Sequence, residues 1–241
     1  MTVIYQPALV LLSVVVAIVG SLTALALTSG QHERDSEAWQ ASFALANGGL
    51  IMGSTIWSMH FIAMMAVDFP TTVNYNLVET IGSICIAIVA TGVGLYLAST
   101  RRLGRGSIPI GGVLMGLGIA GMHYLGMSAI RGCGLAYDLR LVVASLAIAI
   151  GASMAALWFA FYKRGIWTTL AGGVVQGLAI ASMHYTAMAA TYFVPLGVDV
   201  ELATPLFPQS LLAYMIACGM VVLSAGNLGI VALLSAQSRS A

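Results

Sequence analysis

Seven uninterrupted apolar runs, each about as long as a membrane is thick, constrain this chain more than any other feature. They lie at residues 8–29, 42–66, 78–99, 108–130, 139–161, 167–192 and 209–234. A helix needs about 20 apolar residues to cross a bilayer, whereas a transmembrane β-strand needs only about 10 and alternates apolar with polar side chains. The runs therefore predict an all-α, polytopic membrane protein with seven transmembrane helices. The short connections between them predict antiparallel neighbours in one bundle.

The composition excludes several other classes of protein. Hydrophobic residues make up 60% of the 241 residues and charged residues only 7%, whereas soluble domains carry about a quarter charged residues. Nine Lys and Arg against eight Asp and Glu leave no basic face for nucleic acid. The three cysteines, Cys85, Cys133 and Cys218, show no pairing pattern, so a disulfide framework is not expected.

The basic residues predict the orientation of the helices. In a seven-helix chain, most Lys and Arg fall on one side of the membrane, and only Arg131 and Arg140 fall on the other. The residues on the basic side are Arg34, Arg101, Arg102, Arg105, Lys163, Arg164 and Arg239. Loops rich in Lys and Arg stay in the cytoplasm. We therefore expect the N-terminus outside and the C-terminus in the cytoplasm.

One motif occurs three times, in the runs at 42–66, 108–130 and 167–192. Each copy reads Gly-Gly-x-x-x-Gly and then, after four intervening residues, [Ser/Gly]-Met-His-[Phe/Tyr]-x-[Ala/Gly]-Met. The histidines are His60, His123 and His184, which are 63 and 61 residues apart. Since this spacing equals two transmembrane helices with their loops, the sequence predicts a threefold internal repeat of a two-helix unit.

Helical geometry places the chemistry of each motif on one face. At about 100° per residue, the Met four residues after each His and the glycines seven and eleven residues before it lie within about 40° of the His. Glycines at GxxxG spacing let membrane helices approach closely, so we expect this face, with its histidine, to pack inward. Each His lies about 10 Å below the outer end of its run. The three imidazoles should therefore converge at one depth.

Convergent imidazoles and thioethers favour a metal site. Histidine is a common metal ligand, and a mixed set of nitrogen and thioether donors favours copper, whereas zinc is less suited because it seldom uses Met. The candidate ligands are His60, His123, His184, Met64, Met127, Met188, Met59, Met122 and Met183. The alternatives are that the histidines only hydrogen-bond between helices, that the protein anchors a haem, or that it transports or stores copper or zinc. Transport is disfavoured because the inner halves of the motif runs offer mainly Gly, Ala, Leu and Ile, without sets of His, Cys or Met.

Other polar and aromatic residues give weaker signals. Cys133 is either an accessory ligand or a free thiol, and His32 is most simply a solvated loop residue. Asp68 and Glu79 either attract cations or cap and solvate their loop. Trp57, Trp167 and Tyr185 are interpreted as interface anchors or packing residues. No paired nucleophile and base and no phosphate-binding loop is present, so this chain is not expected to be an enzyme.

The three motifs resemble those of the MHYT domain family of bacterial integral-membrane sensors. Ser182-Met183-His184-Tyr185-Thr186 spells the family motif in full, while the copies around His60 and His123 depart from it at the aromatic residue or the threonine. The resemblance covers nearly the whole chain. It implies a seven-helix inner-membrane sensor domain, here residues 1–234, that binds copper near the outer face and detects oxygen, carbon monoxide or nitric oxide.

The resemblance also implies partners. Family members are commonly followed by cytoplasmic GGDEF and EAL modules that make or degrade cyclic di-GMP, and residues 235–241 resemble a stub to which such a module attaches. The other expected partner is the lipid bilayer. The sequence leaves open whether two copies form a homodimer.

The predicted orientation can be tested with reporter fusions. We expect fusions after residues 104 and 241 to report the cytoplasm, because these points follow the basic loops and the last run. Fusions after residues 72 and 200 should report the outer compartment. A cytoplasmic signal at residue 200 or an outer signal at residue 104 would contradict both the seven-helix topology and the shared depth of the histidines.

Overall fold

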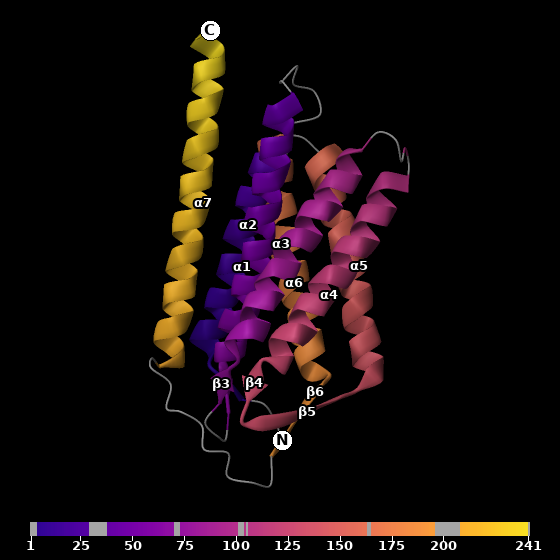
Figure 1. The fold of residues 1–241 in the computed structure, drawn as a ribbon, viewed down its shortest axis with the longest axis vertical. Helices are drawn as coiled ribbons and strands as arrows, with labels where there is room; N and C mark the ends of the chain where they lie inside the picture. The colour runs from indigo at the N-terminus through magenta and orange to yellow at the C-terminus, as the bar shows by residue number, and fades with distance from the viewer. Residues whose placement is uncertain are drawn as a thin grey trace.

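The computed structural model describes residues 4–28, 38–69, 73–100, 104, 106–162, 165–195 and 208–240. Seven helices run along the molecule, and each is long and apolar enough to span a membrane. They are α1 (Pro7–Thr28), α2 (Ala38–Met65), α3 (Leu77–Ser99), α4 (Ser107–Ser128), α5 (Leu139–Tyr162), α6 (Ile166–Ala189) and α7 (Gln209–Ser240). The predicted helical membrane architecture is thus confirmed, and the two ends of the chain lie at opposite ends of the bundle (Figure 1).

Three short two-stranded sheets, which the sequence analysis did not predict, lie at one end of the bundle. In each sheet, the strand that follows a motif helix pairs with the strand that precedes α1, α3 or α5, and all pairs are antiparallel. The pairs are β1 (Ile4–Tyr5) with β2 (Val67–Asp68), β3 (Asn74–Tyr75) with β4 (Ile130–Arg131), and β5 (Cys133–Tyr137) with β6 (Thr191–Pro195). We call this end of the bundle the strand end.

The strands correct two predicted helix ends. The runs predicted at 108–130 and 167–192 extend beyond the observed ends of α4 and α6, because Ala129 and Ala190 are turn residues. Their carbonyls accept backbone hydrogen bonds of 2.8 Å from Asn76 and Asp138, which lead into α3 and α5. Hydropathy could not distinguish the apolar turn and strand residues after these helices from the helices themselves. Ile130 in β4, for example, is as buried as a core residue of a helix. At the opposite end of the chain, α7 continues without a break past residue 234.

The first six helices form a closed ring. Each helix contacts the next, α6 contacts α1, and the motif helix α2 also contacts the motif helices α4 and α6. Helix α7 packs outside the ring against α1 and α2 (Figure 1). The threefold repeat of the sequence is therefore a threefold arrangement in space, with an α1, α3 or α5 helix between each pair of motif helices.

Paired glycines let each motif helix fit between its two neighbours. A Cβ at the first glycine of a pair would meet the preceding helix of the ring, and a Cβ at the second would meet the following helix. The contacts are Gly48 with α1, Gly111 with α3 and Gly172 with α5, and then Gly49 with α3, Gly112 with α5 and Gly173 with α1. The Gly-Gly pair thus serves two helix interfaces at one level.

The GxxxG faces were expected to pack toward the bundle axis together with the histidines. This expectation is wrong, because the glycines contact neighbouring helices of the ring instead. A Cβ at Gly116 would lie 2.6 Å from Cα of Ile150 on α5, and Gly53 and Gly177 approach α3 and α1 in the same way. The residues that line the axis are four residues apart on each motif helix, a row that is itself inclined to the helix axis. The glycines seven and eleven residues from each His leave that row and face the neighbouring helix instead.

The row of every fourth residue builds four layers of side chains along the axis. From the strand end, they are Met64, Met127 and Met188; His60, His123 and His184; Ile56, Ile119 and Ile180; and Met52, Met115 and Gln176. The last layer lies two helical turns from the histidines, in the half of the bundle away from the strands. The prediction that this half lacks a methionine set is therefore wrong for Met52 and Met115.

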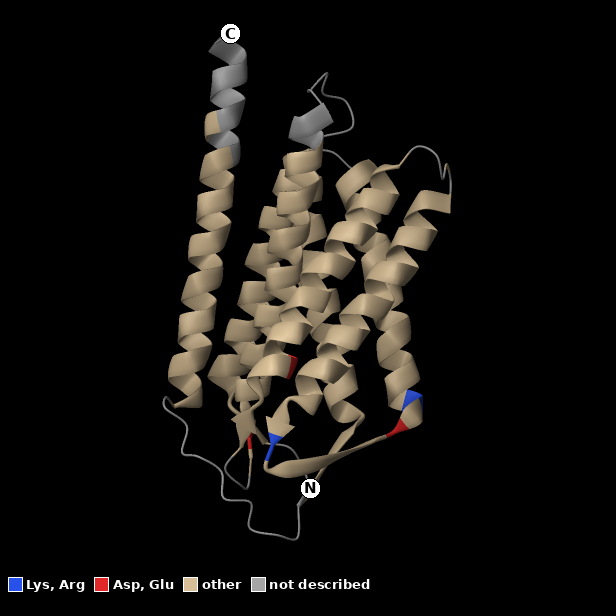
Figure 2. Ribbon diagram, viewed as in Figure 1, with Lys and Arg blue, Asp and Glu red and all other residues tan. Residues whose placement is uncertain are grey.

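Charged residues gather at the strand end, as far as the structure describes them (Figure 2). Arg131 on β4 and Glu79 on α3 form an ion pair of 2.6 Å. Both groups are partly exposed, so the pair adds little stability. Part of the predicted orientation signal lies outside the described residues, namely Arg34, Arg101, Arg102, Arg105, Lys163 and Arg164, as does His32.

The role of the glycine contacts can be tested at Gly116. Gly116→Leu should lower the melting temperature of the purified protein by several degrees or prevent folding, because a side chain there would overlap the backbone of α5. Gly121→Leu is the matched control on the same helix, since nothing lies within 4 Å of a Cβ at Gly121. Equal melting temperatures for the two variants would contradict the assigned interface.

Candidate metal centre

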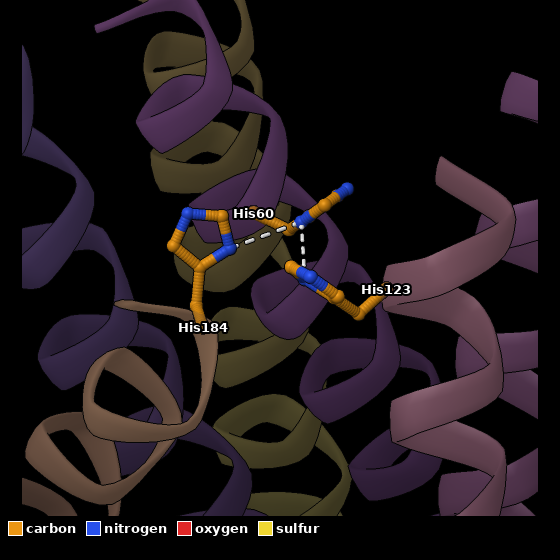
Figure 3. Close-up of side chains that lie close together, drawn as sticks. All are labelled: His60, His123 and His184. Carbon is orange, nitrogen blue, oxygen red and sulfur yellow. Dashed lines mark hydrogen bonds between the residues drawn. The ribbon is translucent and has the colours of Figure 1, made fainter. Parts of the chain in front are cut away.

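Three histidines meet on the axis of the bundle. His60, His123 and His184 come from α2, α4 and α6, and each side chain is only 1% exposed. The Nδ1 atom of His60 lies 3.1 Å from Nδ1 of His123 and 3.1 Å from Nδ1 of His184 (Figure 3). The predicted convergence of the three imidazoles at one depth is therefore observed.

Hydrogen bonds among the described residues do not satisfy these rings. A neutral imidazole has one N–H donor and one acceptor nitrogen. Nδ1 of His60 therefore cannot donate to one neighbour and accept from the other, although both lie at the same distance. The three Nε2 atoms are buried and have no partner in the described part of the chain. Unpaired polar groups at this depth are costly, and a ligand that binds these nitrogens would satisfy them.

Two of the three spacings between the histidine nitrogens match those expected around one metal ion. Two nitrogens bound to one tetrahedral ion at about 2.0 Å lie about 3.3 Å apart, close to the two observed distances of 3.1 Å. One ligand nitrogen from each histidine lies within 4.8 Å of the others. The residues therefore fit an ion held by His60, His123 and His184, on a donor set of imidazole nitrogens.

The predicted methionine ligands divide into two groups. Those four residues after each His form a buried cluster with Val67, Ile130 and Phe193 on the strand side of the histidines. Those directly before each His belong to the main core of the bundle. The first group is Met64, Met127 and Met188, and the second is Met59, Met122 and Met183. All six are buried, and only the first group forms a layer of its own next to the imidazoles.

Aromatic residues that follow the histidines anchor the motif helices. Each His ring contacts the next aromatic ring edge-on, at centroid distances of 4.9 Å for His123 and Tyr124 and 5.0 Å for His184 and Tyr185. The Tyr124 hydroxyl lies 2.9 Å from Oγ of Ser145, and the Tyr185 hydroxyl lies 3.0 Å from Oγ of Ser13. These bonds tie α4 to α5 and α6 to α1 beside the histidines.

The first repeat achieves the same link with a different residue. Phe61 has no hydroxyl, and Nε1 of Trp57, one turn earlier on α2, donates to Oγ of Ser83 on α3 at 3.0 Å. The Trp57 and Phe61 rings pack with their centroids 4.6 Å apart. Trp57 was interpreted as an interface anchor or a packing residue; the structure confirms the packing role and adds a partly buried hydrogen bond to α3.

Three tyrosines at the strand end repeat this symmetry. Tyr5, Tyr75 and Tyr137 precede α1, α3 and α5, and each contacts the aromatic residue that follows a motif histidine. Each tyrosine lies eight residues before one of the bonded serines, Ser13, Ser83 and Ser145. These residues lie outside the three motif runs, so the triplicated motif does not include them. The repeated Tyr-x₇-Ser spacing is the signal that would have found them.

The remaining candidates lie away from the histidines. Cys133 is half-buried at the strand end, and burial raises the pKa of its thiol. A protonated thiol is a poor metal ligand, so this favours the free-thiol interpretation. Cys85 and Cys218 are exposed on α3 and α7, and Trp167 is exposed at the start of α6. The exposure of Trp167 agrees with an interface anchor.

Comparison with protein families gives one match over most of the chain. Residues 1–41, 53–111, 116–173 and 177–236 match the MHYT family, described as a bacterial signalling protein N-terminal repeat. The matched description is that of a signalling repeat and not of an enzyme, as expected. No solved structure shows significant similarity to the chain.

Several bacterial proteins are similar in sequence. The bifunctional diguanylate cyclase/cyclic di-GMP phosphodiesterase MucR of Pseudomonas aeruginosa is 38% identical over 80% of the chain. The cyclic di-GMP phosphodiesterase NbdA of the same organism is 36% identical over 82%, and the signaling protein YkoW of Bacillus subtilis is 33% identical over 78%. These alignments cover 29%, 26% and 24% of the three relatives, so the chain spans less than a third of their length.

The substitute link at Trp57 predicts a rescue. Trp57→Phe should lower the melting temperature by a few degrees, because it removes a partly buried hydrogen bond worth about 1 kcal/mol. Adding Phe61→Tyr should restore most of that loss, since the new hydroxyl can reach Ser83 as Tyr124 reaches Ser145. Trp167→Phe, at an exposed position, is the control. If Phe61→Tyr gave no recovery, the equivalence of the three links would be wrong.

Proposed function

Because the chain belongs to the MHYT family of bacterial signalling repeats, we propose that it is a membrane sensor whose three motif histidines hold a metal ion. The single observation that carries this proposal is the convergence of three buried Nδ1 atoms whose hydrogen bonding cannot be completed within the cluster. A signalling role agrees with the relatives, whose names are those of signalling proteins and cyclic di-GMP enzymes.

Copper is the ion that the surrounding donors favour. The layer of Met64, Met127 and Met188 lies one helical turn from the histidines and brings three thioethers to the strand side of the site. Soft thioethers combined with imidazoles suit copper, whereas zinc rarely uses Met and magnesium or calcium prefer oxygen. When bound, copper would supply an open coordination position for a diatomic gas such as oxygen, carbon monoxide or nitric oxide. The residues of this chain hold the ion, exclude water and set its depth.

The proposed orientation places the strand end at the outer face of the bacterial inner membrane. This orientation rests on the distribution of Lys and Arg along the sequence, of which only Arg131 and Arg140 fall on the strand side. In this orientation, the C-terminal end of α7 enters the cytoplasm. An output module of the GGDEF or EAL type, with a diguanylate cyclase or phosphodiesterase activity like those in the names of two relatives, would be joined at that side.

Helix α7 offers a route for the signal. It has 32 residues, which at 1.5 Å per residue gives about 48 Å, more than the roughly 30 Å of a bilayer core. Its buried face packs on α1 and α2, and Met220 on α7 contacts the hydroxyl of Thr55, five residues before His60 on α2. A shift of α2 caused by a change at the histidines would therefore act directly on α7.

Copper or zinc transport is the alternative function, because Met52, Met115 and Gln176 form a second polar and soft layer along the axis. A complete layer of Ile56, Ile119 and Ile180 separates it from the histidines. The cavities beside these layers measure only about 20 and 10 Å³. An ion would have no continuous path between the two layers, so sensing agrees better with the packing than transport.

Metal analysis tests the site. The purified chain should carry copper at one to a few atoms per molecule, and the His60/His123/His184 triple alanine variant should lose most of it. Gly126→Ala should also weaken retention of copper, because a Cβ there would collide with the imidazole of His60. Gly121→Ala is the matched control, with nothing within 4 Å of its Cβ. Equal copper content in the wild type and the triple variant would contradict the proposed site.

A signalling assay tests the function. The chain should be joined to a diguanylate cyclase, and cyclic di-GMP measured after exposure to nitric oxide, carbon monoxide, oxygen and copper. His123→Ala should abolish the response, because it removes one ligand of the ion. Its melting temperature should be measured in parallel, since the substitution also leaves a cavity at a buried position. If this variant responded like the wild type to every stimulus, the histidine cluster would not be the sensor.

A further inference from the structure

Gln176 breaks the threefold pattern of the deepest layer. The equivalent residues in the other two repeats are Met52 and Met115, so a methionine would satisfy the packing at this position. Gln176 is only 5% exposed, and its Nε2 donates to Sδ of Met52 at 3.3 Å. Its Oε1 atom is buried and has no hydrogen-bond partner among the described residues. A polar side chain therefore stands where an apolar one would fit, with half of its amide unsatisfied.

A second unsatisfied group faces the same space. Ser153 on α5 is 2% exposed, and its Oγ also lacks a partner in the described part of the chain. Gln176 and Ser153 both line a cavity of about 20 Å³. The rest of the wall is apolar and includes Met183, which directly precedes His184, and the Ile56, Ile119 and Ile180 layer. The cavity thus lies just beneath the histidines, on the side away from the strands.

The chemistry of the two groups defines what can fill the cavity. An amide oxygen only accepts hydrogen bonds, so the occupant must carry a hydrogen that it can donate, whereas a serine hydroxyl can donate or accept. A cavity must offer about 10–15 Å³ and at least two polar partners to hold a water molecule. Oxygen, carbon monoxide and nitric oxide carry no hydrogen and cannot satisfy Gln176. A water molecule meets both the size and the hydrogen-bonding requirement.

We propose that one water molecule is bound in this cavity and bridges Oε1 of Gln176 on α6 to Oγ of Ser153 on α5. With the bond from Gln176 to Met52, the bridge joins α5, α6 and α2 through one polar network inside the membrane. The bound water satisfies both buried groups, whose desolvation would otherwise oppose folding. This site is separate from the histidine centre and does not depend on metal binding.

High-resolution structure determination of the full chain in lipid nanodiscs tests the site directly. We expect a density peak within hydrogen-bond distance of Gln176 Oε1 and Ser153 Oγ, and its loss in Ser153→Ala. An empty cavity beside well-ordered side chains would overturn the proposal. A direct bond between Oε1 and Oγ, with the cavity closed, would overturn it as well.

A thermal double-mutant cycle tests it independently. Ser153→Ala should lower the melting temperature by several degrees in the wild type, because the bound water loses a partner and Gln176 is left unsatisfied. The same change should have little effect in a Gln176→Met background, where the repeat residue replaces the amide and no water is needed. Ser182→Ala, an exposed serine on α6 that bonds its own helix, is the control. An equal shift from Ser153→Ala in both backgrounds would contradict a shared water.

Discussion

The burial of three imidazoles on the axis of a membrane-spanning bundle is the constraint on which the rest of the structure depends. Polar rings at this depth are tolerated only if they meet one another or a ligand, which requires α2, α4 and α6 to keep a fixed spacing and rotation. The paired glycines draw each motif helix against its two neighbours, and the Trp57, Tyr124 and Tyr185 links to buried serines tie it to the following helix. The short sheets then fix the chain where each motif helix ends.

The threefold symmetry is informative where it fails. Phe61 lacks the hydroxyl of its counterparts, and Trp57 supplies the missing bond from the previous turn. Gly126 stands where the other repeats have Ala63 and Ala187, because the ring of His60 occupies the space that a Cβ would need. Gln176 replaces a methionine, and no described side chain satisfies the amide oxygen that this replacement buries. The first two departures preserve the histidine cluster, and the third introduces new chemistry beneath it.

In a sensor of this kind, a movement at the histidines reaches α7 through few intervening contacts. The histidines contribute one ring from each repeat, so any change in their separation moves α2, α4 and α6 relative to one another. Because the glycine interfaces bring backbones into contact, these movements cannot be absorbed by side-chain rearrangement alone. Helix α7 rests on α2 and α1 and extends beyond the length needed to cross a bilayer, which makes it the natural element to carry a displacement out of the membrane.

The sequence by itself determined the seven helices, the two-helix repeat and the convergence of His60, His123 and His184. The hydropathy of a segment and the helical period of 3.6 residues can both be evaluated within a single helix, without knowledge of its neighbours. Only the tertiary structure decided which helix each glycine faces, since Gly116 lies close in angle to His123 on α4 and yet packs against Ile150 of α5. It also decided the strands, whose pairing joins distant segments such as Tyr5 and Val67. The Trp57–Ser83 bond and the layer of Met52, Met115 and Gln176 likewise depend on contacts between helices, which no pattern along one helix encodes.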